Sequence, residues 1–145
     1  MKVSKFITGA LLILLGFIAC NKEDEVDPVI TCDQKVKISE YEFLNAPDDQ
    51  LVIDTLEING DCLKITFSSG GCDGESWEIK LIDSASVVYT DPPQRNLRLS
   101  LKNEELCDAW ITKEITFDIS ALHLGTNNVI LNIVNSGDQI TFHYK

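Results

Sequence analysis

Basic residues are scarce in this chain of 145 residues, where 12 lysines and arginines stand against 23 aspartates and glutamates. The formal net charge is −11. A surface of this sign repels the phosphates of nucleic acids and the headgroups of anionic lipids. We therefore expect no nucleic-acid partner, and we attribute the acidity to solubility.

The signatures of zinc, redox and hydrolytic chemistry are also missing. No Cys-x-x-Cys motif occurs, and the only two histidines, His123 and His143, lie far along the chain from the cysteines, which disfavours a zinc or redox site. Ser68 and Ser69 lack the Gly-x-Ser-x-Gly elbow of serine hydrolases. We expect no catalytic residue, no cofactor and no metal, with His143 exposed and His123 in a loop.

No apolar run reaches the roughly 20 residues that a transmembrane helix needs. The longest, Phe6 to Ala19, has 14 residues and follows Lys2 and Lys5. A basic start, an apolar stretch and a small residue before the cleavage point are the parts of a secretory signal. We predict that residues 1–19 are a cleaved signal peptide.

The end of this stretch, Phe17-Ile18-Ala19-Cys20, resembles the lipobox of bacterial lipoproteins. The resemblance implies cleavage before Cys20, whose thiol and new amino group would carry acyl chains. Phe17 departs from the leucine that is commoner there. The alternative is an ordinary signal peptide followed by an incidental cysteine. Cleavage leaves 10 basic and 23 acidic residues, a formal net charge of −13.

Residues 20–31 form a predicted acidic tether, too polar and charged to fold. Within it, Asn21-Lys22-Glu23-Asp24-Glu25 resembles the export signal of Bacteroidota lipoproteins. That resemblance implies a lipid-anchored protein on the outer face of the outer membrane, with the periplasmic face as the alternative. Two or more acyl chains hold a protein on a bilayer stably.

Four cysteines follow the tether, namely Cys32, Cys62, Cys72 and Cys107. An even number in an exported chain indicates two disulfides, formed in an oxidising compartment. The residues alone leave three pairings open.

Apolar and polar residues alternate with a period of two along most of the remaining chain, which is typical of half-buried strands. The alternating segments are 36–43, 63–67, 77–81, 97–101, 115–119, 129–133 and 140–144, and further strands are expected at the mostly apolar 51–58 and at 87–89. Asn59-Gly60 predicts a hairpin turn. Residues 68–74 are predicted as a flexible bend, and one helical turn is expected in each of 103–108 and 120–124.

This pattern predicts a single all-β domain over residues 32–145, an antiparallel β-sandwich, Ig-like or similar, of about eight or nine short strands. A small β-barrel is the alternative. Parallel α/β folds are disfavoured because no amphipathic helix separates the strands.

From Ser69 to Leu122 the chain resembles a recurring domain of uncharacterised bacterial lipoproteins and secreted proteins. The residues that carry the resemblance are Gly70-Gly71-Cys72, Trp77-x-Ile79, Pro92-Pro93-Gln94, Leu97-x-Leu99, Cys107-Asp108-Ala109 and Phe117-Asp118-Ile119-Ser120 with Leu122. It implies that Cys72 pairs with Cys107, which leaves Cys32 to Cys62. Members often carry histidines where this chain has Glu75 and Leu101, so the resemblance implies no site.

Bonding Cys72 to Cys107 would gather Asp73, Glu75 and Asp108, whose oxygens suit calcium, although no EF-hand spacing is present. For the two tryptophans we expect core packing. Trp110 lies near a polar loop, and the alternative for it is an exposed position in which it contacts a sugar or a protein.

These observations favour a lipid-anchored, non-catalytic binding module at the cell surface, with an unidentified protein or glycan partner. One alternative is a structural accessory subunit of an envelope complex. Another is an unrecognised hydrolase, which would need two carboxylates in a cleft.

Overall fold

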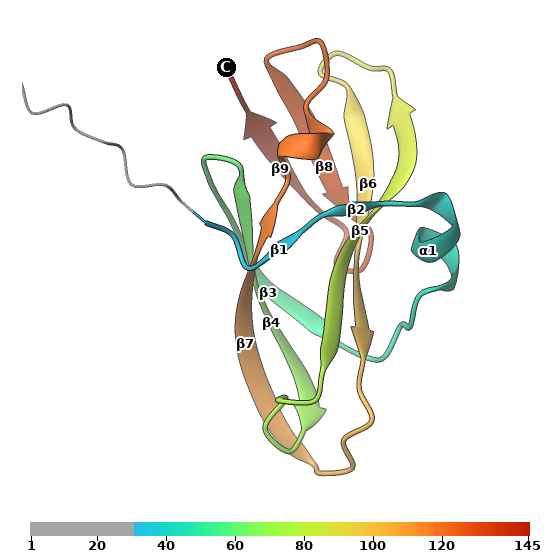
Figure 1. Ribbon diagram of the computed structural model, residues 1–145, viewed down its shortest axis with the longest axis vertical. Helices are drawn as coiled ribbons and strands as arrows, with labels where there is room; N and C mark the ends of the chain where they lie inside the picture. The colour runs from blue at the N-terminus through green and yellow to red at the C-terminus, as the bar shows by residue number, and fades with distance from the viewer. Residues whose placement is uncertain (1–30) are drawn as a thin grey trace, which may run out of the picture.

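The computed structural model describes residues 31–145, so the predicted signal peptide, Cys20 and residues 21–30 of the tether lie outside the described residues. Residues 31–145 form nine strands in two facing sheets (Figure 1). The predicted β-sandwich is confirmed, and this part of the chain does not close into a barrel. Neither of its helices is long and apolar enough to cross a membrane.

One sheet has four strands in the order β1-β7-β4-β3, and the other has five in the order β2-β5-β6-β8-β9. The strands are β1 (Gln34–Lys35), β2 (Lys37–Ile38), β3 (Val52–Asn59), β4 (Cys62–Gly71), β5 (Glu78–Val88), β6 (Gln94–Lys102), β7 (Ala109–Asp118), β8 (Asn128–Ile133) and β9 (Asp138–His143). The helices are α1 (Glu40–Asn45) and the 3-10 helix η1 (Ser120–Leu122).

The sheets are mixed, whereas the sequence predicted antiparallel ones. The long neighbours pair antiparallel, but β1 with β7, β2 with β5, and β6 with β8 pair parallel. Strand β6 and strand β8 run the same way because β7, which comes between them along the chain, belongs to the other sheet. The polar alternation along each strand does not reveal such a crossing.

The core lies between the sheets and is filled by every second residue of the central strands. Leu63, Ile65 and Phe67 on β4 are fully buried, and so are Leu97, Leu99 and Leu101 on β6. Each such side chain stabilises the fold by roughly 1.5–3 kcal/mol relative to an exposed position. The Asn59-Gly60 hairpin is confirmed, since Asn59 pairs with Cys62 across the turn.

The first described segment joins the two sheets along one side of the sandwich. Strand β1 pairs with β7, and two residues later β2 pairs with β5, with Val36 buried between them. A disulfide links Cys32 to Cys62 at the start of β4. This segment therefore covers the side where β7 and β5 would otherwise be sheet edges.

The alternation predicted over 36–43 is wrong beyond Ile38, where the chain forms α1. Ser39 Oγ caps this helix by accepting a hydrogen bond from the backbone N–H of Glu42 (3.2 Å). At the other end, Arg98 Nη2 donates to the carbonyls of Glu42 and Ala46 (3.0 Å each). The Ser-x-x-Glu spacing of a capping box favours a helix here more strongly than the alternation of Tyr41 and Phe43 favours a strand.

Three further local predictions meet different outcomes. Residues 68–71 are not a bend, because β4 continues to Gly71. Residues 103–108 form an irregular loop without a helical turn, whereas a 3-10 turn is present at 120–122. Residues 87–88 end β5 after a register shift and are not a separate strand.

That register shift coincides with an ion pair buried between two strands. The guanidinium of Arg95 donates from Nε and Nη2 to the two oxygens of Asp83 (2.9 and 2.8 Å). The side chain of Asp83 is fully buried and that of Arg95 is 8% exposed. Asp83 Oδ1 also accepts from the N–H of Ala85 (2.8 Å), which has a positive φ of 60°. The pair therefore fixes the irregular part of β5.

We expect Asp83→Ala to lower the free energy of unfolding by about 3–5 kcal/mol, because it leaves the Arg95 guanidinium buried without its counter-charge. Urea denaturation followed by circular dichroism measures the loss. The double variant Asp83→Leu with Arg95→Met, which removes both charges, should lose much less. Equal losses in the two variants would show that the charge pairing is not what matters.

Candidate functional site

Two loops lie side by side at one end of the sandwich, at the bottom of Figure 1. One is the β4–β5 connection, residues 72–77, and the other is the β6–β7 connection from residue 103 to residue 108. A disulfide joins Cys72 to Cys107 across them. This bond and the Cys32–Cys62 bond form the pairing that the family resemblance implies.

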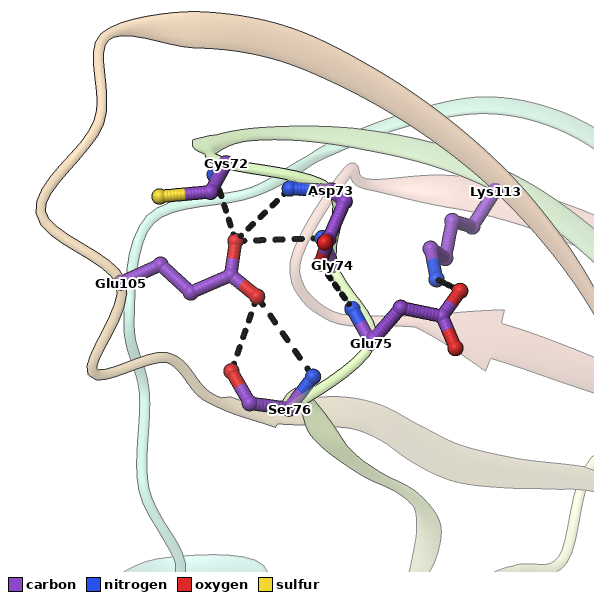
Figure 2. A network of polar contacts seen from close by, with 7 residues as sticks. All are labelled: Cys72, Asp73, Gly74, Glu75, Ser76, Glu105 and Lys113. Carbon is purple, nitrogen blue, oxygen red and sulfur yellow. Dashed lines mark hydrogen bonds and ion pairs between the residues drawn. The ribbon is translucent and has the colours of Figure 1, made fainter.

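The carboxylate of Glu105 fills a cradle of donors on the opposite loop (Figure 2). Its Oε2 accepts from the backbone N–H groups of Cys72 (2.6 Å), Asp73 (3.3 Å) and Gly74 (3.1 Å). Its Oε1 accepts from the Ser76 hydroxyl (2.8 Å) and the Ser76 N–H (3.5 Å). Successive N–H groups aimed at one point form an anion-binding nest. Here the chain's own glutamate occupies it.

This environment sets the charge of Glu105. Desolvation alone would raise its pKa, but the Ser76 hydroxyl and the backbone N–H groups of Cys72, Gly74 and Asp73 outweigh it and lower the pKa to about 2. Hydrogen bonds to a carboxylate favour its ionised form. Glu105 therefore acts as a charged structural bridge between the two loops.

The cradle is packed closely against Trp77, which is buried as predicted and contacts Phe67 with 5.9 Å between ring centroids. A Cβ on Gly71 would lie 2.5 Å from Oε2 of Glu105 and 2.9 Å from Cζ2 of Trp77. A side chain there would have to displace both Glu105 and Trp77. Gly74 has a φ of +70°, which favours glycine.

The three acids considered for calcium do not form a cation site. Asp73 Oδ1 accepts from the N–H of Glu75 (2.9 Å), and the Glu75 carboxylate pairs with Lys113 (3.3 Å; Figure 2). Asp108 is exposed. Within residues 31–145, no three acidic, histidine or cysteine side chains are placed to hold a metal ion.

Trp110 is 60% exposed, so the prediction that it packs in the core is wrong. It lies on β7 directly opposite Gly70 of β4, on the outer face of the four-stranded sheet. The even-numbered positions of β7 face outwards because Phe117, an odd position, is in the core. A Cβ on Gly70 would have no atom within 4 Å. The space across from the indole is therefore open.

A hollow of about 290 Å³ adjoins this indole and is lined by Asp49, Gln50, Ser69, Gly70, Asn103 and Trp110. Hydrogen bonds fix its frame. Asn103 donates from its backbone N–H to Asp49 Oδ2 and from its side-chain amide to the Gly70 carbonyl (2.7 Å each). The Ser69 hydroxyl donates to the Gln50 carbonyl (2.7 Å). This hollow combines an uncovered aromatic ring with fixed polar groups.

A larger hollow of about 600 Å³ lies beside the Cys32–Cys62 disulfide and contains Asp33, Asp61 and Asp118. Hydrogen bonds from the Thr116 hydroxyl and N–H lower the pKa of Asp33. Those from the Ser120 hydroxyl and N–H lower the pKa of Asp118. A glycosidase-type general acid needs its pKa raised. We therefore assign Asp33 and Asp118 a structural role, in which their carboxylates accept hydrogen bonds from neighbouring segments.

The histidines and serines considered for catalysis are placed as follows. His123 follows η1, where its Nε2 lies 3.0 Å from Asp61 Oδ1 and its ring stacks on Tyr144 with 4.1 Å between centroids. His143 is exposed on β9. The Ser68 hydroxyl, in β4, donates to Asp54 Oδ2 (2.6 Å). The structure brings none of these histidines to a serine within hydrogen-bonding distance.

Sequence reasoning missed Glu105 and Asn103, which hold the loops together. Both look like ordinary loop polar residues, and most of their partners are backbone groups that no sequence motif indicates. The exposure of Trp110 was accessible from the sequence, because it alternates in step with Thr112, Glu114 and Thr116 and out of step with Phe117.

We expect the cradle to make stability depend on acid pH. Since the folded-state pKa of Glu105, about 2, lies below its ordinary value of 4.5, its contribution is complete above about pH 4.5 and is lost as the pH falls towards 2. Urea unfolding midpoints measured across this range should fall less steeply in Glu105→Gln than in the unchanged protein. Glu104→Gln, at the exposed neighbouring position, is the matched control. Parallel slopes for Glu105→Gln and the unchanged protein would contradict the assignment.

The adjacent glycines provide a second test, because they differ in the space around them. Gly71→Ala should destabilise the fold by about 1–3 kcal/mol, since the new methyl group displaces Glu105 and Trp77. Gly70→Ala should change stability by less than about 0.5 kcal/mol, as expected for an open surface position. Thermal unfolding of the two variants measures both. A larger loss for Gly70→Ala than for Gly71→Ala would refute the packing described here.

Comparison with known proteins gives little guidance. No family model and no curated protein matches the chain. Among solved structures, a protein from Parabacteroides distasonis that is provisionally described as toxin-related is similar, with a TM-score of 0.48 and 14% identity. The match covers 77% of this chain and 60% of that chain. A likeness at this level carries no argument about function.

Proposed function

We propose that the chain is a lipoprotein of the cell envelope, anchored through Cys20, whose sandwich serves as a non-catalytic binding module on the outer surface of the outer membrane. The observation that carries this proposal is the use of the cysteines. The two disulfides take four of the five cysteines in the sequence. Cys20, directly behind the apolar run, is the fifth.

The position of the disulfides also supports display of the loop end. The tether reaches the sandwich at Cys32, which is bonded to Cys62 at the start of β4. Gly70, beside Trp110, lies eight residues further along the same strand. A strand rises about 3.3 Å per residue, so the hollow lies roughly 26 Å from the attachment point. The hollow and the residue where the predicted tether joins the domain therefore lie near opposite ends of β4.

A binding role is favoured over catalysis by the state of the acidic groups. Two of the three carboxylates in the larger hollow, those of Asp33 and Asp118, have their pKa lowered by hydrogen bonds from neighbouring residues, which favours the ionised form. The uncovered ring of Trp110, by contrast, is free to contact another molecule. Exposed aromatic groups of this kind are common at binding surfaces.

The anchor is tested by metabolic labelling with an alkyne analogue of palmitate. We expect the unchanged protein to take up the label and to sediment with membranes, whereas Cys20→Ser takes up no label because the acceptor thiol is gone. A variant whose residues 1–20 are replaced by a cysteine-free secretory signal should be released in soluble form. Label on Cys20→Ser, or none on the unchanged protein, would refute lipid attachment at this residue.

Surface display is measured on the same cells with a membrane-impermeant amine-reactive biotin reagent. Lysines of the sandwich should react in intact cells if the domain faces outwards. Reaction only after permeabilisation would place it on the periplasmic face.

A structural accessory role is the second candidate, and one observation favours it. Helix α1 presents Tyr41 and Leu44 to solvent, 75% and 70% exposed, close to the half-exposed Ile38 on β2. Apolar side chains gathered at a surface are typical of protein contacts. Chemical cross-linking in intact cells separates the two roles, because an accessory subunit is recovered with a constant protein partner at fixed stoichiometry.

A further inference from the structure

We propose that the hollow beside Trp110 binds a neutral saccharide, with a sugar ring stacked on the exposed indole. This inference specifies the ligand class of the proposed binding module and rests on that proposal. Its basis is the combination of an uncovered aromatic face, fixed polar groups without positive charge, and a rigid frame.

The aromatic face is open because of the residue opposite it. In a sheet, the side chain directly across from an aromatic residue packs against it. Here that residue is Gly70, and the space where its side chain would stand is empty to 4 Å. The other tryptophan, Trp77, is only 9% exposed. Trp110 therefore offers a flat apolar surface that the domain itself does not use.

The polar groups around the indole suit hydroxyl groups. Asp49 contributes a carboxylate with one oxygen held by the Asn103 N–H (2.7 Å), so its other oxygen remains an acceptor. Gln50, exposed on the same rim, carries both an amide donor and an amide acceptor. A small number of placed polar groups beside an apolar surface is the usual composition of a small-molecule site. A sugar ring matches it, with C–H groups on one face and hydroxyls at the edge.

Charge narrows the ligand class. Among residues 31–145, no lysine or arginine lines the hollow, and the chain has a formal net charge of −11. Phosphorylated, sulfated and uronic-acid ligands would meet repulsion without a compensating cation. A cationic ligand would be attracted by the indole and by Asp49, but the amide N–H groups of Gln50 would then have no acceptor to bind. A neutral saccharide can use the indole together with the free polar groups of Asp49 and Gln50.

The frame is fixed before any ligand arrives. Asn103 binds Asp49 and the Gly70 carbonyl, and its Oδ1 accepts from the N–H of Glu105 (3.0 Å). Glu105 in turn holds the opposite loop, which the Cys72–Cys107 disulfide closes. A site whose walls are already ordered loses little conformational entropy on binding. Weak stacking and a few hydrogen bonds therefore suffice for measurable affinity.

The test uses the full mature protein, purified in a zwitterionic detergent so that no sugar-based detergent competes. The probes are maltohexaose, cellohexaose, xylohexaose and mannohexaose, with hexalysine and a galacturonic-acid oligomer as charged comparisons. Titration calorimetry measures binding. Acrylamide quenching of tryptophan fluorescence reports on Trp110, because Trp77 is buried. We expect at least one neutral hexasaccharide to bind and to protect the fluorescence from quenching.

Two variants locate the site and one controls for it. Trp110→Ala should weaken saccharide binding by about tenfold or more, the usual effect of removing an aromatic anchor. Gly70→Val, which fills the space across from an intact indole, should weaken it similarly. Tyr89→Ala removes an aromatic side chain that is 88% exposed on the β5–β6 connection, at the far end of β5. It should leave binding unchanged.

Three results would overturn the inference: no neutral hexasaccharide binds, binding persists in both Trp110→Ala and Gly70→Val, or only a charged probe binds at Trp110. Each is independent of acyl labelling at Cys20. A labelled protein that binds no saccharide refutes this ligand class and leaves the anchored binding module intact. Saccharide binding by an unlabelled protein refutes the anchor alone.

Discussion

The burial of alternate side chains on β4 and β7 is the constraint on which the rest of the structure depends. Once Leu63, Ile65 and Phe67 enter the core, the even positions of β4, Gly70 among them, must face outwards. Once Phe117 enters it, Trp110 must do the same. The antiparallel register then places these two outward residues opposite each other. A one-residue slip would bury the indole and expose the core, so the open aromatic face is a product of the same pattern that makes the sandwich.

The loop end is organised differently, by polar groups rather than by a core. Residues 103–108 have no regular secondary structure, yet Asn103 and Glu105 give them fixed partners on two other segments. The backbone N–H groups of residues 72–74 lie just beyond the end of β4, where no neighbouring strand accepts their hydrogen bonds. The Glu105 carboxylate accepts these bonds instead. Buried or half-buried N–H groups need such acceptors. Close packing at Gly71 shows that this contact is as specific as one in the core.

The sequence predicted those features that repeat or that carry a local signal. The strands, the Asn59-Gly60 hairpin and the sandwich follow from alternation and turn chemistry. The parallel pairings do not, because they depend on which sheet β7 joins. Helix α1 was missed because the alternating apolar residues suggested a strand, whereas the N-terminal cap formed by Ser39 stabilises a helix. Glu105 was missed because its partners, four backbone N–H groups and the Ser76 hydroxyl, lie about 30 residues away in sequence and approach it only in the folded protein.

The Cys32–Cys62 bond has a mechanical consequence when the chain is pulled at its N-terminal end. Without it, tension on the chain would peel the two-residue strand β1 from β7, one hydrogen bond at a time. With it, the load passes through the disulfide into β4, a ten-residue strand paired on both sides by β3 and β7. Force directed along β4 shears both ladders at once, so many hydrogen bonds must yield together. Tension applied at the N-terminal end is thus carried by a strand that is paired on both sides.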